Sequence, residues 1–206
     1  MDRIRVMVVD DHAIARVGLV SLLETEEGIE VVGQCEDGEA ALADALRLRP
    51  DVVVMDLMMP KKDGVAATRE IRAQLPGTRI LILTTFGASD DIAHALEAGA
   101  SGAPMKNTGI TELIEAIRAV ADGRRAVAPE IEQMIAECPP VPELTRRQME
   151  ILHSVTRGLT NKDIANQLDI GEKRVEELVN SIFSKINAAN RAEAVAIALR
   201  KHLLKI

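Results

Sequence analysis

The sequence predicts two domains: an α/β domain built on a doubly wound, five-stranded parallel sheet, and an all-α domain of four helices. Up to residue 122, short β-branched apolar runs alternate with amphipathic helical patterns, which is typical of a parallel sheet covered on both faces. From residue 143 onward the apolar spacing is helical throughout. A chain of 206 residues has room for two small domains.

The elements of the first domain follow one another in strict alternation. We expect strands at residues 4–9, 31–33, 52–55, 80–83 and 103–105. Helical patterns lie at residues 12–24, 37–48, 64–74, 88–98 and 109–121. Right-handed crossovers leave few ways to arrange these units, and the flavodoxin-like strand order is common among them. We therefore assign residues 1–122 to this domain.

A change of composition marks the domain boundary. A short helical pattern at 130–137 leads into the run Pro-Pro-Val-Pro at 139–142, which is typical of a stiff, extended connector. We expect a linker over residues 123–142 and the second domain over residues 143–206. Its helices are predicted at 145–157, 161–168, 172–186 and 191–203, with Thr145 and Thr160 as N-caps.

Charge divides unevenly between the two domains. Residues 1–122 carry 12 Lys and Arg against 21 Asp and Glu, a net charge of −9, whereas residues 143–206 carry 11 against 8, a net charge of +3. Only the second domain is therefore suited to nucleic acid.

The sequence contains no sign of a membrane segment, a signal peptide or a disulfide framework. No window approaches the ~20 apolar residues of a membrane span, and the first residues lack the pattern of a signal peptide. We expect a cytoplasmic protein without membrane association. Cys35 and Cys138 lie far apart, so the sequence predicts neither a disulfide framework nor a zinc site.

Three aspartates fall at the ends of predicted strands. Asp10 and Asp11 follow the first strand, and Asp56 follows the third. Ligands of a doubly wound sheet bind beyond the carboxyl ends of its strands, where these side chains would meet. Crowded carboxylates repel one another unless a cation lies between them, and Mg²⁺ prefers such oxygen ligands. Thr84 and Lys106, after the fourth and fifth strands, supply the hydroxyl and ammonium that phosphoryl transfer to a carboxylate requires.

Each aspartate alone also has an ordinary structural explanation. Asp10 and Asp11 could cap the next helix, and Asp56 could simply end a strand. The full set of three Asp, one Thr and one Lys favours a phosphoryl-transfer site instead.

We expect His12 to begin a helix at the rim of the pocket. A phosphohydrolase would need an acid or base two residues after the acceptor aspartate, where this chain has Met58. We therefore predict that the protein is not an enzyme, and the only chemistry that we expect is slow loss of its own phosphoryl group.

These motifs resemble the receiver domain of two-component response regulators over residues 1 to about 122. The matching segments are Val8-Val9-Asp10-Asp11-His12, Asp56-Leu57-Met58-Met59-Pro60-Lys61-Lys62-Asp63-Gly64, Leu83-Thr84-Thr85 and Ala98-Gly99-Ala100 to Lys106. The resemblance implies that a histidine kinase phosphorylates Asp56. It also implies that Asp11, Asp56 and the carbonyl of Met58 hold Mg²⁺, with Asp10 acting through a water. Thr84 and Lys106 would contact the phosphoryl group. Ala103 stands where many members have a switch aromatic.

The second domain resembles the LuxR-type helix-turn-helix output domain of NarL/FixJ-type response regulators over residues 143–203. The matching segments are Leu144-Thr145-Arg146-Arg147-Gln148-Met149-Glu150-Ile151-Leu152, Gly158-Leu159-Thr160-Asn161-Lys162-Asp163-Ile164-Ala165 and Arg191-Ala192-Glu193-Ala194-Val195. The resemblance implies a recognition helix at about 172–186 for the major groove of promoter DNA. It also implies a homodimer on two half-sites, formed when the protein is phosphorylated. Candidate DNA contacts are Lys162, Lys173, Arg174, Glu176, Glu177, Asn180, Lys185 and Arg191.

The recognition helix departs from its relatives at Glu176, where a contacting lysine is common. Glu176 and Glu177 should weaken binding to a polyanion, although glutamate can accept a hydrogen bond from cytosine N4. The basic candidates could also be ordinary solvated charges. Two hypotheses therefore stay open. One is a phosphorylation-controlled transcriptional regulator that dimerises on promoter DNA. The other is an atypical regulator whose output domain binds a protein partner, or binds DNA only weakly.

Overall fold

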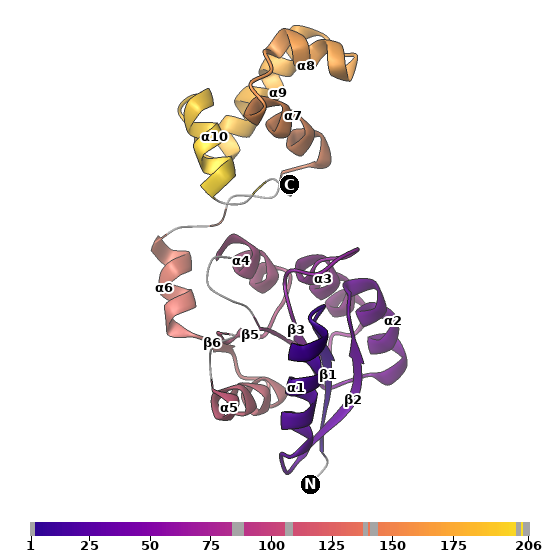
Figure 1. The fold of residues 1–206 in the computed structure, drawn as a ribbon. Coiled ribbons are helices and arrows are strands. Elements are labelled where there is room, and N and C mark those ends of the chain that lie inside the picture. Colours follow the sequence, from indigo (N-terminus) through magenta and orange to yellow (C-terminus); the bar gives the residue numbers. More distant parts are fainter. Residues whose placement is uncertain are drawn as a thin grey trace. The chain divides into compact units, whose positions relative to one another are not determined.

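A computed structural model of the chain describes residues 3–83, 89–105, 109–137, 140, 144–200 and 203. The chain forms two compact units, Met1–Pro140 and Val141–Ile206. The strands of the first unit are β1 Ile4–Val9, β2 Ile29–Cys35, β3 Val52–Met55, β4 Arg79–Ile82, β5 Gly102–Ala103 and β6 Ala126–Val127. Its helices are α1 Ala13–Glu24, α2 Gly38–Leu48, α3 Gly64–Gln74, α4 Ser89–Glu97, α5 Ile110–Ala121 and α6 Pro129–Glu137 (Figure 1).

The strands of the first unit form one parallel sheet in the order β2-β1-β3-β4-β5-β6. Alternate residues of each strand face opposite sides of the sheet, so the unit has two cores. Val6 and Val8 of β1 pack with residues of α1 and α5, whereas Met7 and Val9 pack with residues of α2, α3, α4 and α6. The register of β1 against β2 shifts between Val6 and Met7. The predicted doubly wound parallel architecture is confirmed.

The predicted number of five strands was wrong, because a sixth strand follows α5. The N–H of Ala126 donates to the carbonyl of Ser101 (3.1 Å), and the N–H of Ala128 donates to the carbonyl of Ala103 (3.1 Å). A Cβ at Gly102 would lie 2.3 Å from the carbonyl oxygen of Ala126, so this close pairing requires glycine there. A strand of two residues is too short to leave a recognisable apolar period in the sequence.

The segment that we predicted to be a linker, residues 123–142, therefore includes folded elements. After β6 the chain forms α6, and Ile131 of this helix is fully buried among side chains of the sheet and α4. The first unit accordingly extends to Pro140 rather than ending at residue 122. The helical pattern of α6 is visible in the sequence, but its place on the sheet is not.

The described part of the second unit contains the four predicted helices, α7 Arg146–Thr156, α8 Asn161–Leu168, α9 Glu172–Lys185 and α10 Arg191–Arg200 (Figure 1). Thr145 and Thr160 are the N-caps of α7 and α8, and each side-chain hydroxyl accepts a hydrogen bond from a backbone N–H three residues later. Gly158 has a φ of +81°, which suits the left-handed turn after α7. Among the described residues, no helix is long and apolar enough to cross a membrane.

Candidate functional site

The aspartates at the ends of β1 and β3 lie at the same edge of the sheet. Both extend the parallel pairing by one residue, since the N–H of Asp10 donates to the carbonyl of Cys35 (3.2 Å) and that of Asp56 donates to the carbonyl of Val9 (2.9 Å). Asp10 is 3% exposed and Asp56 is 7% exposed. The backbone of the sheet therefore fixes two buried carboxylates side by side.

Four side chains form an acidic cluster at this edge, which we define as Asp10, Asp11, His12 and Asp56. Each offers one potential ligand atom, and these atoms all lie within 4.8 Å of one another. Oδ1 of Asp11 is buried and accepts no hydrogen bond from the described residues, although Nδ1 of His12 lies 2.7 Å away. A buried carboxylate oxygen beside two other carboxylates fits a hard divalent cation. The acidic cluster can therefore hold a metal ion.

Hydrogen bonds within the site orient two of the carboxylates. Oδ1 of Asp56 accepts from the N–H of Leu57 (2.8 Å), and Oδ1 of Asp10 accepts from the N–H of His12 (2.8 Å). Nη1 of Arg16 in α1 donates to the carbonyl of Asp10 (2.5 Å). Arg16 could not be predicted as part of the site, because a basic residue in the helix after the acidic pair is a weak signal by itself.

His12 begins α1 as its N-cap residue, as expected from the sequence. Its side chain is 70% exposed, and Nδ1 lies 2.7 Å from Oδ1 of Asp11 and 3.4 Å from Oδ1 of Asp10. When the imidazole is protonated, it forms an ion pair with Asp11 at the rim of the acidic cluster.

Of the remaining residues of the predicted phosphoryl-transfer site, the structure describes Met58. Met58 lies in the loop between β3 and α3, two residues after Asp56, with an exposed side chain. Thr84 and Lys106 lie outside the described residues. Ala103, at the position of the switch aromatic, is fully buried in β5 and packs in the same core cluster as Ile131 of α6.

A glycine closes the loop that carries Met58. The N–H of Gly64 donates to the carbonyl of Leu57 (2.9 Å), and a Cβ at Gly64 would lie only 2.3 Å from the carbonyl oxygen of Asp56. Asp63 then caps α3 by accepting from the N–H of Ala66 (2.9 Å). The loop therefore leaves β3 and returns directly onto it.

The predicted recognition helix is α9, and it has one buried and one exposed face. Val175, Val179 and Ile182 are buried in the core of the second unit. The turn before this helix is tight, since Asp169 has a φ of +50° and Gly171 is already the N-cap of α9. The exposed face carries five of the candidate DNA contacts, namely Lys173, Arg174, Glu176, Glu177 and Asn180.

Three of the basic candidates already have partners within the second unit. Arg174 forms an ion pair with Glu177 one turn later (2.8 Å). Nζ of Lys185 donates to Oε1 of Gln148 in α7 (3.0 Å), and the guanidinium of Arg191 donates to the carbonyl of Leu159. The Lys185 contact joins α9 to α7, and the Arg191 contact joins α10 to the loop between α7 and α8, so these side chains stabilise the unit whatever else they contact. Lys162 is exposed in the first turn of α8.

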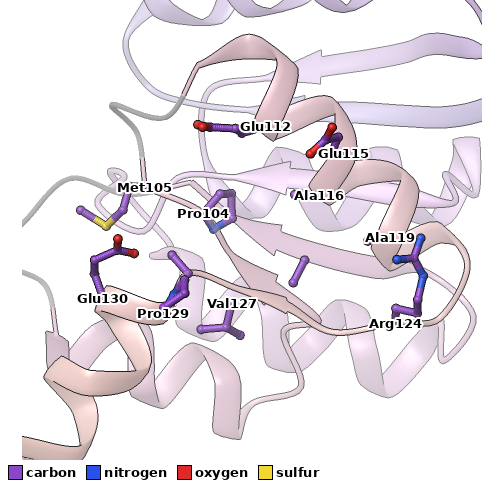
Figure 2. Close-up of a pocket in the computed structure, with 12 residues that line it drawn as sticks. Pro104, Met105, Glu112, Glu115, Ala116, Ala119, Arg124, Val127, Pro129 and Glu130 are labelled. Carbon is purple, nitrogen blue, oxygen red and sulfur yellow. The ribbon is translucent and has the colours of Figure 1, made fainter.

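A separate cavity lies between α5 and the segment that forms β6 and the start of α6. Figure 2 shows Glu112 and Glu115 along α5 and Pro129 on the opposite wall. The cavity has a volume of about 820 Å³ and a partly apolar lining that includes Pro104, Ala116, Ala119 and Val127. Its lining contains no member of the acidic cluster, so the two sites are distinct.

Comparison with known proteins identifies the family of both units. Residues 6–118 match the family model of the response regulator receiver domain, and residues 142–198 match that of bacterial regulatory proteins of the luxR family. The transcriptional regulatory protein LiaR of Bacillus subtilis (strain 168) is 36% identical over 213 residues, covering 98% of this chain and 99% of LiaR. The response regulator protein VraR of Staphylococcus aureus (strain NCTC 8325 / PS 47) is 36% identical over 207 residues, covering 98% and 99%.

A solved structure also matches along the whole chain. The crystal structure of the response regulator ChrA, from a heme-sensing two-component system, is 36% identical, with a TM-score of 0.59 and coverage of 99% of this chain and 100% of that chain. The chain therefore belongs to the two-component response regulators, with a receiver domain followed by a LuxR-type DNA-binding domain. The family resemblance of both domains is confirmed.

Proposed function

We propose that this protein is a phosphorylation-controlled transcriptional regulator. Its receiver domain takes a phosphoryl group on Asp56 from a sensor histidine kinase, and its output domain binds promoter DNA as a homodimer on two half-sites. The observation that supports this most strongly is the meeting of Asp10, Asp11 and Asp56 at one edge of the sheet, in a chain of this family.

Mg²⁺ is the metal that we propose for the acidic cluster. The carboxylates of Asp11 and Asp56 and the backbone carbonyl of Met58 would hold it, with Asp10 acting through a water. The buried oxygen of Asp11 supports this choice, because it lies among carboxylates whose mutual repulsion a cation would offset. Bound Mg²⁺ would offset the negative charge of the transferred phosphoryl group.

Asp56 is the proposed nucleophile of the transfer. A carboxylate oxygen of Asp56 bonds to phosphorus while the bond from phosphorus to the kinase histidine nitrogen breaks, and the histidine keeps that electron pair. The N–H of Leu57 holds Oδ1 of Asp56, so the carboxylate is oriented before the donor arrives. Thr84 and Lys106 would bind the phosphoryl oxygens after transfer.

The exposed face of α1 offers a surface for the kinase. Ile14, Val17 and Leu22 are 91%, 57% and 49% exposed, and with Gly18 and Ser21 they form an uncharged stripe. The stripe begins two residues after His12, beside the acidic cluster. An exposed apolar surface next to the acceptor fits a protein donor better than a small molecule. Ile14→Lys should therefore reduce transfer from a kinase that phosphorylates the wild type, and leave phosphorylation by acetyl phosphate unchanged.

The output domain would read DNA through the exposed face of α9. Asn180 can pair with adenine, and a glutamate can accept a hydrogen bond from cytosine N4. Arg174 is held by Glu177, which reduces its availability to a phosphate. Glu176 and Glu177 favour the second candidate function, a domain that binds a protein partner or binds DNA only weakly.

A DNA selection experiment at fixed salt concentration tests both candidates. Full-length wild type, Asp56→Asn and the double variant Glu176→Lys/Glu177→Val are treated with acetyl phosphate and Mg²⁺, and bound sequences are recovered from a random pool. We expect the wild type to enrich a two-fold symmetric site and Asp56→Asn to enrich none. Enrichment by the double variant alone would contradict DNA binding by the natural protein and favour a protein partner. Equal enrichment by wild type and Asp56→Asn would contradict control by phosphorylation.

A further inference from the structure

An ion pair links the loop after the phosphoryl acceptor to the start of α2. Oδ2 of Asp37 accepts from Nζ of Lys61 at 2.5 Å. The other oxygen of Asp37 accepts from the N–H groups of Glu39 (3.0 Å) and Ala40 (2.9 Å), because Asp37 is the N-cap of α2. Asp37 is only 2% exposed. The lysine is therefore held by a carboxylate that is itself fixed by the helix.

The backbone of Lys61 adopts a conformation that disfavours a side chain. Its φ is +61°, in the left-handed region, where glycine would be unstrained. The N–H of Lys62 donates to the carbonyl of Pro60 (2.7 Å) across this residue, and the side chain of Lys61 adds the ion pair with Asp37. The ion pair therefore helps to hold the loop in this conformation.

A second contact ties the same two segments at the backbone. The N–H of Gly38 donates to the carbonyl of Lys62 (3.2 Å), and a Cβ at Gly38 would lie 2.6 Å from that oxygen. Because the two chains touch here, the turn that contains Lys61 and Lys62 cannot shift unless the start of α2 moves with it.

The turn that contains Lys61 and Lys62 follows the proposed metal ligand, Met58, along the chain. The loop is anchored near β3 by the hydrogen bond from Gly64 to Leu57, and at its far end by Asp37 and Gly38. Met58 lies between these anchors. The position of its carbonyl therefore depends on both ends of the loop being fixed.

We propose that Asp37 and Lys61 are positioning residues for phosphorylation. Their ion pair sets the loop so that the Met58 carbonyl and Asp56 are placed for Mg²⁺, and loss of either charge weakens Mg²⁺ binding and slows phosphoryl transfer. This inference rests on the proposed function, because it assumes that Met58 and Asp56 hold the metal.

The test compares two lysines of the same loop in the full-length protein. Lys61→Met removes the ion pair with Asp37, whereas Lys62→Met removes an ion pair with Glu70 of α3 (2.6 Å) at the same cost in charge. The Lys62 carbonyl that contacts Gly38 is unaffected by that control. Lys61→Arg keeps the positive charge, and Asp37→Asn removes the partner. Calorimetric titration with MgCl₂, the rate of phosphorylation by acetyl phosphate and urea unfolding are measured for each.

We expect Lys61→Met and Asp37→Asn each to raise the Kd for Mg²⁺ about tenfold, the range seen when groups that orient a metal ligand are removed. Lys62→Met should stay within about twofold of the wild type, Lys61→Arg should recover most of the affinity, and the double variant Asp37→Asn/Lys61→Met should bind no more weakly than either single variant. A purely structural role would lower the urea midpoint without this pattern in Mg²⁺ affinity.

Equal Mg²⁺ affinities of Lys61→Met and Lys62→Met would overturn the inference. Wild type that binds Mg²⁺ but is not phosphorylated would overturn the proposed function and the predicted effect on phosphoryl transfer, whereas the affinities would still decide whether Asp37 and Lys61 position the Mg²⁺ ligands. Wild type that binds no Mg²⁺ would overturn both.

Discussion

Replacing Ile131 with alanine tests whether α6 is an integral part of the receiver domain. The side chain is fully buried and packs in the core that includes Ala103, Met105 and Ile92. The change removes three carbon atoms, worth about 2.4 kcal/mol of lost burial at ~0.8 kcal/mol each, and adds a cavity term. We expect the free energy of unfolding of the first unit to fall by about 3 kcal/mol, within the usual range for Ile→Ala.

Urea unfolding followed by circular dichroism at 222 nm measures this loss. The chain has no Trp or Tyr and only two Phe, so intrinsic fluorescence reports little. With a denaturant slope of about 2 kcal/mol per molar urea, the midpoint of the receiver transition should fall by about 1.5 M, while the transition of the second unit stays unchanged. Glu132→Ala, at an exposed position on the same helix, is the matched control. If Ile131→Ala shifts the midpoint no more than Glu132→Ala does, α6 is not part of the core and the linker predicted at 123–142 was correct.

Three further predictions concern charge. Hydrogen bonds from Ala40 and Lys61 hold the pKa of Asp37 below its usual range, so this carboxylate stabilises the first unit above about pH 4, and the effect is lost as pH falls through the lowered pKa. In a plot of the urea midpoint against pH, Asp37→Asn should therefore reduce the fall at acidic pH, and an unchanged fall would contradict this. Mg²⁺ at about 100 times its Kd should raise the free energy of unfolding of the first unit by about 2.7 kcal/mol, and a gain of the same size in Asp11→Ala would exclude Asp11 as a ligand. Glu177→Gln releases Arg174, so the slope of log affinity for DNA against log salt should steepen by about 1, and an identical slope would show that Arg174 contacts no phosphate.

The acidic cluster could be predicted because the strands that position it are strongly patterned. The apolar runs before Asp10 and Asp56 are strands buried on both faces, so their ends are easy to locate in the sequence. Parallel strands place their carboxyl ends at one edge, which brings the two aspartates together without further information. The N-caps Thr145 and Thr160 were predictable for a similar reason, because capping depends on residues close in the sequence.

Contacts between distant segments could not be predicted in the same way. β6 has two residues and therefore no period, and the burial of Ile131 depends on the sheet edge that β6 creates. Nothing local indicates that Lys61 has a positive φ or that it reaches Asp37, 24 residues earlier. Lys185 and Arg191 were selected as phosphate contacts because they are basic, whereas the structure shows that Lys185 also joins α9 to α7 and that Arg191 also joins α10 to the loop before α8. Charge alone does not reveal which cations already have partners.

The two outer strands of the sheet bear on how copies of this protein can associate. An open strand edge can pair with the same strand of another molecule and start aggregation. β6 offers two residues and is followed closely by Pro129, which has no N–H to donate. β2 is longer, but its pairing with β1 is irregular, and Glu30 places an exposed side chain along it. Pairing between receivers is therefore disfavoured at both strand edges, which favours helical surfaces for any self-association.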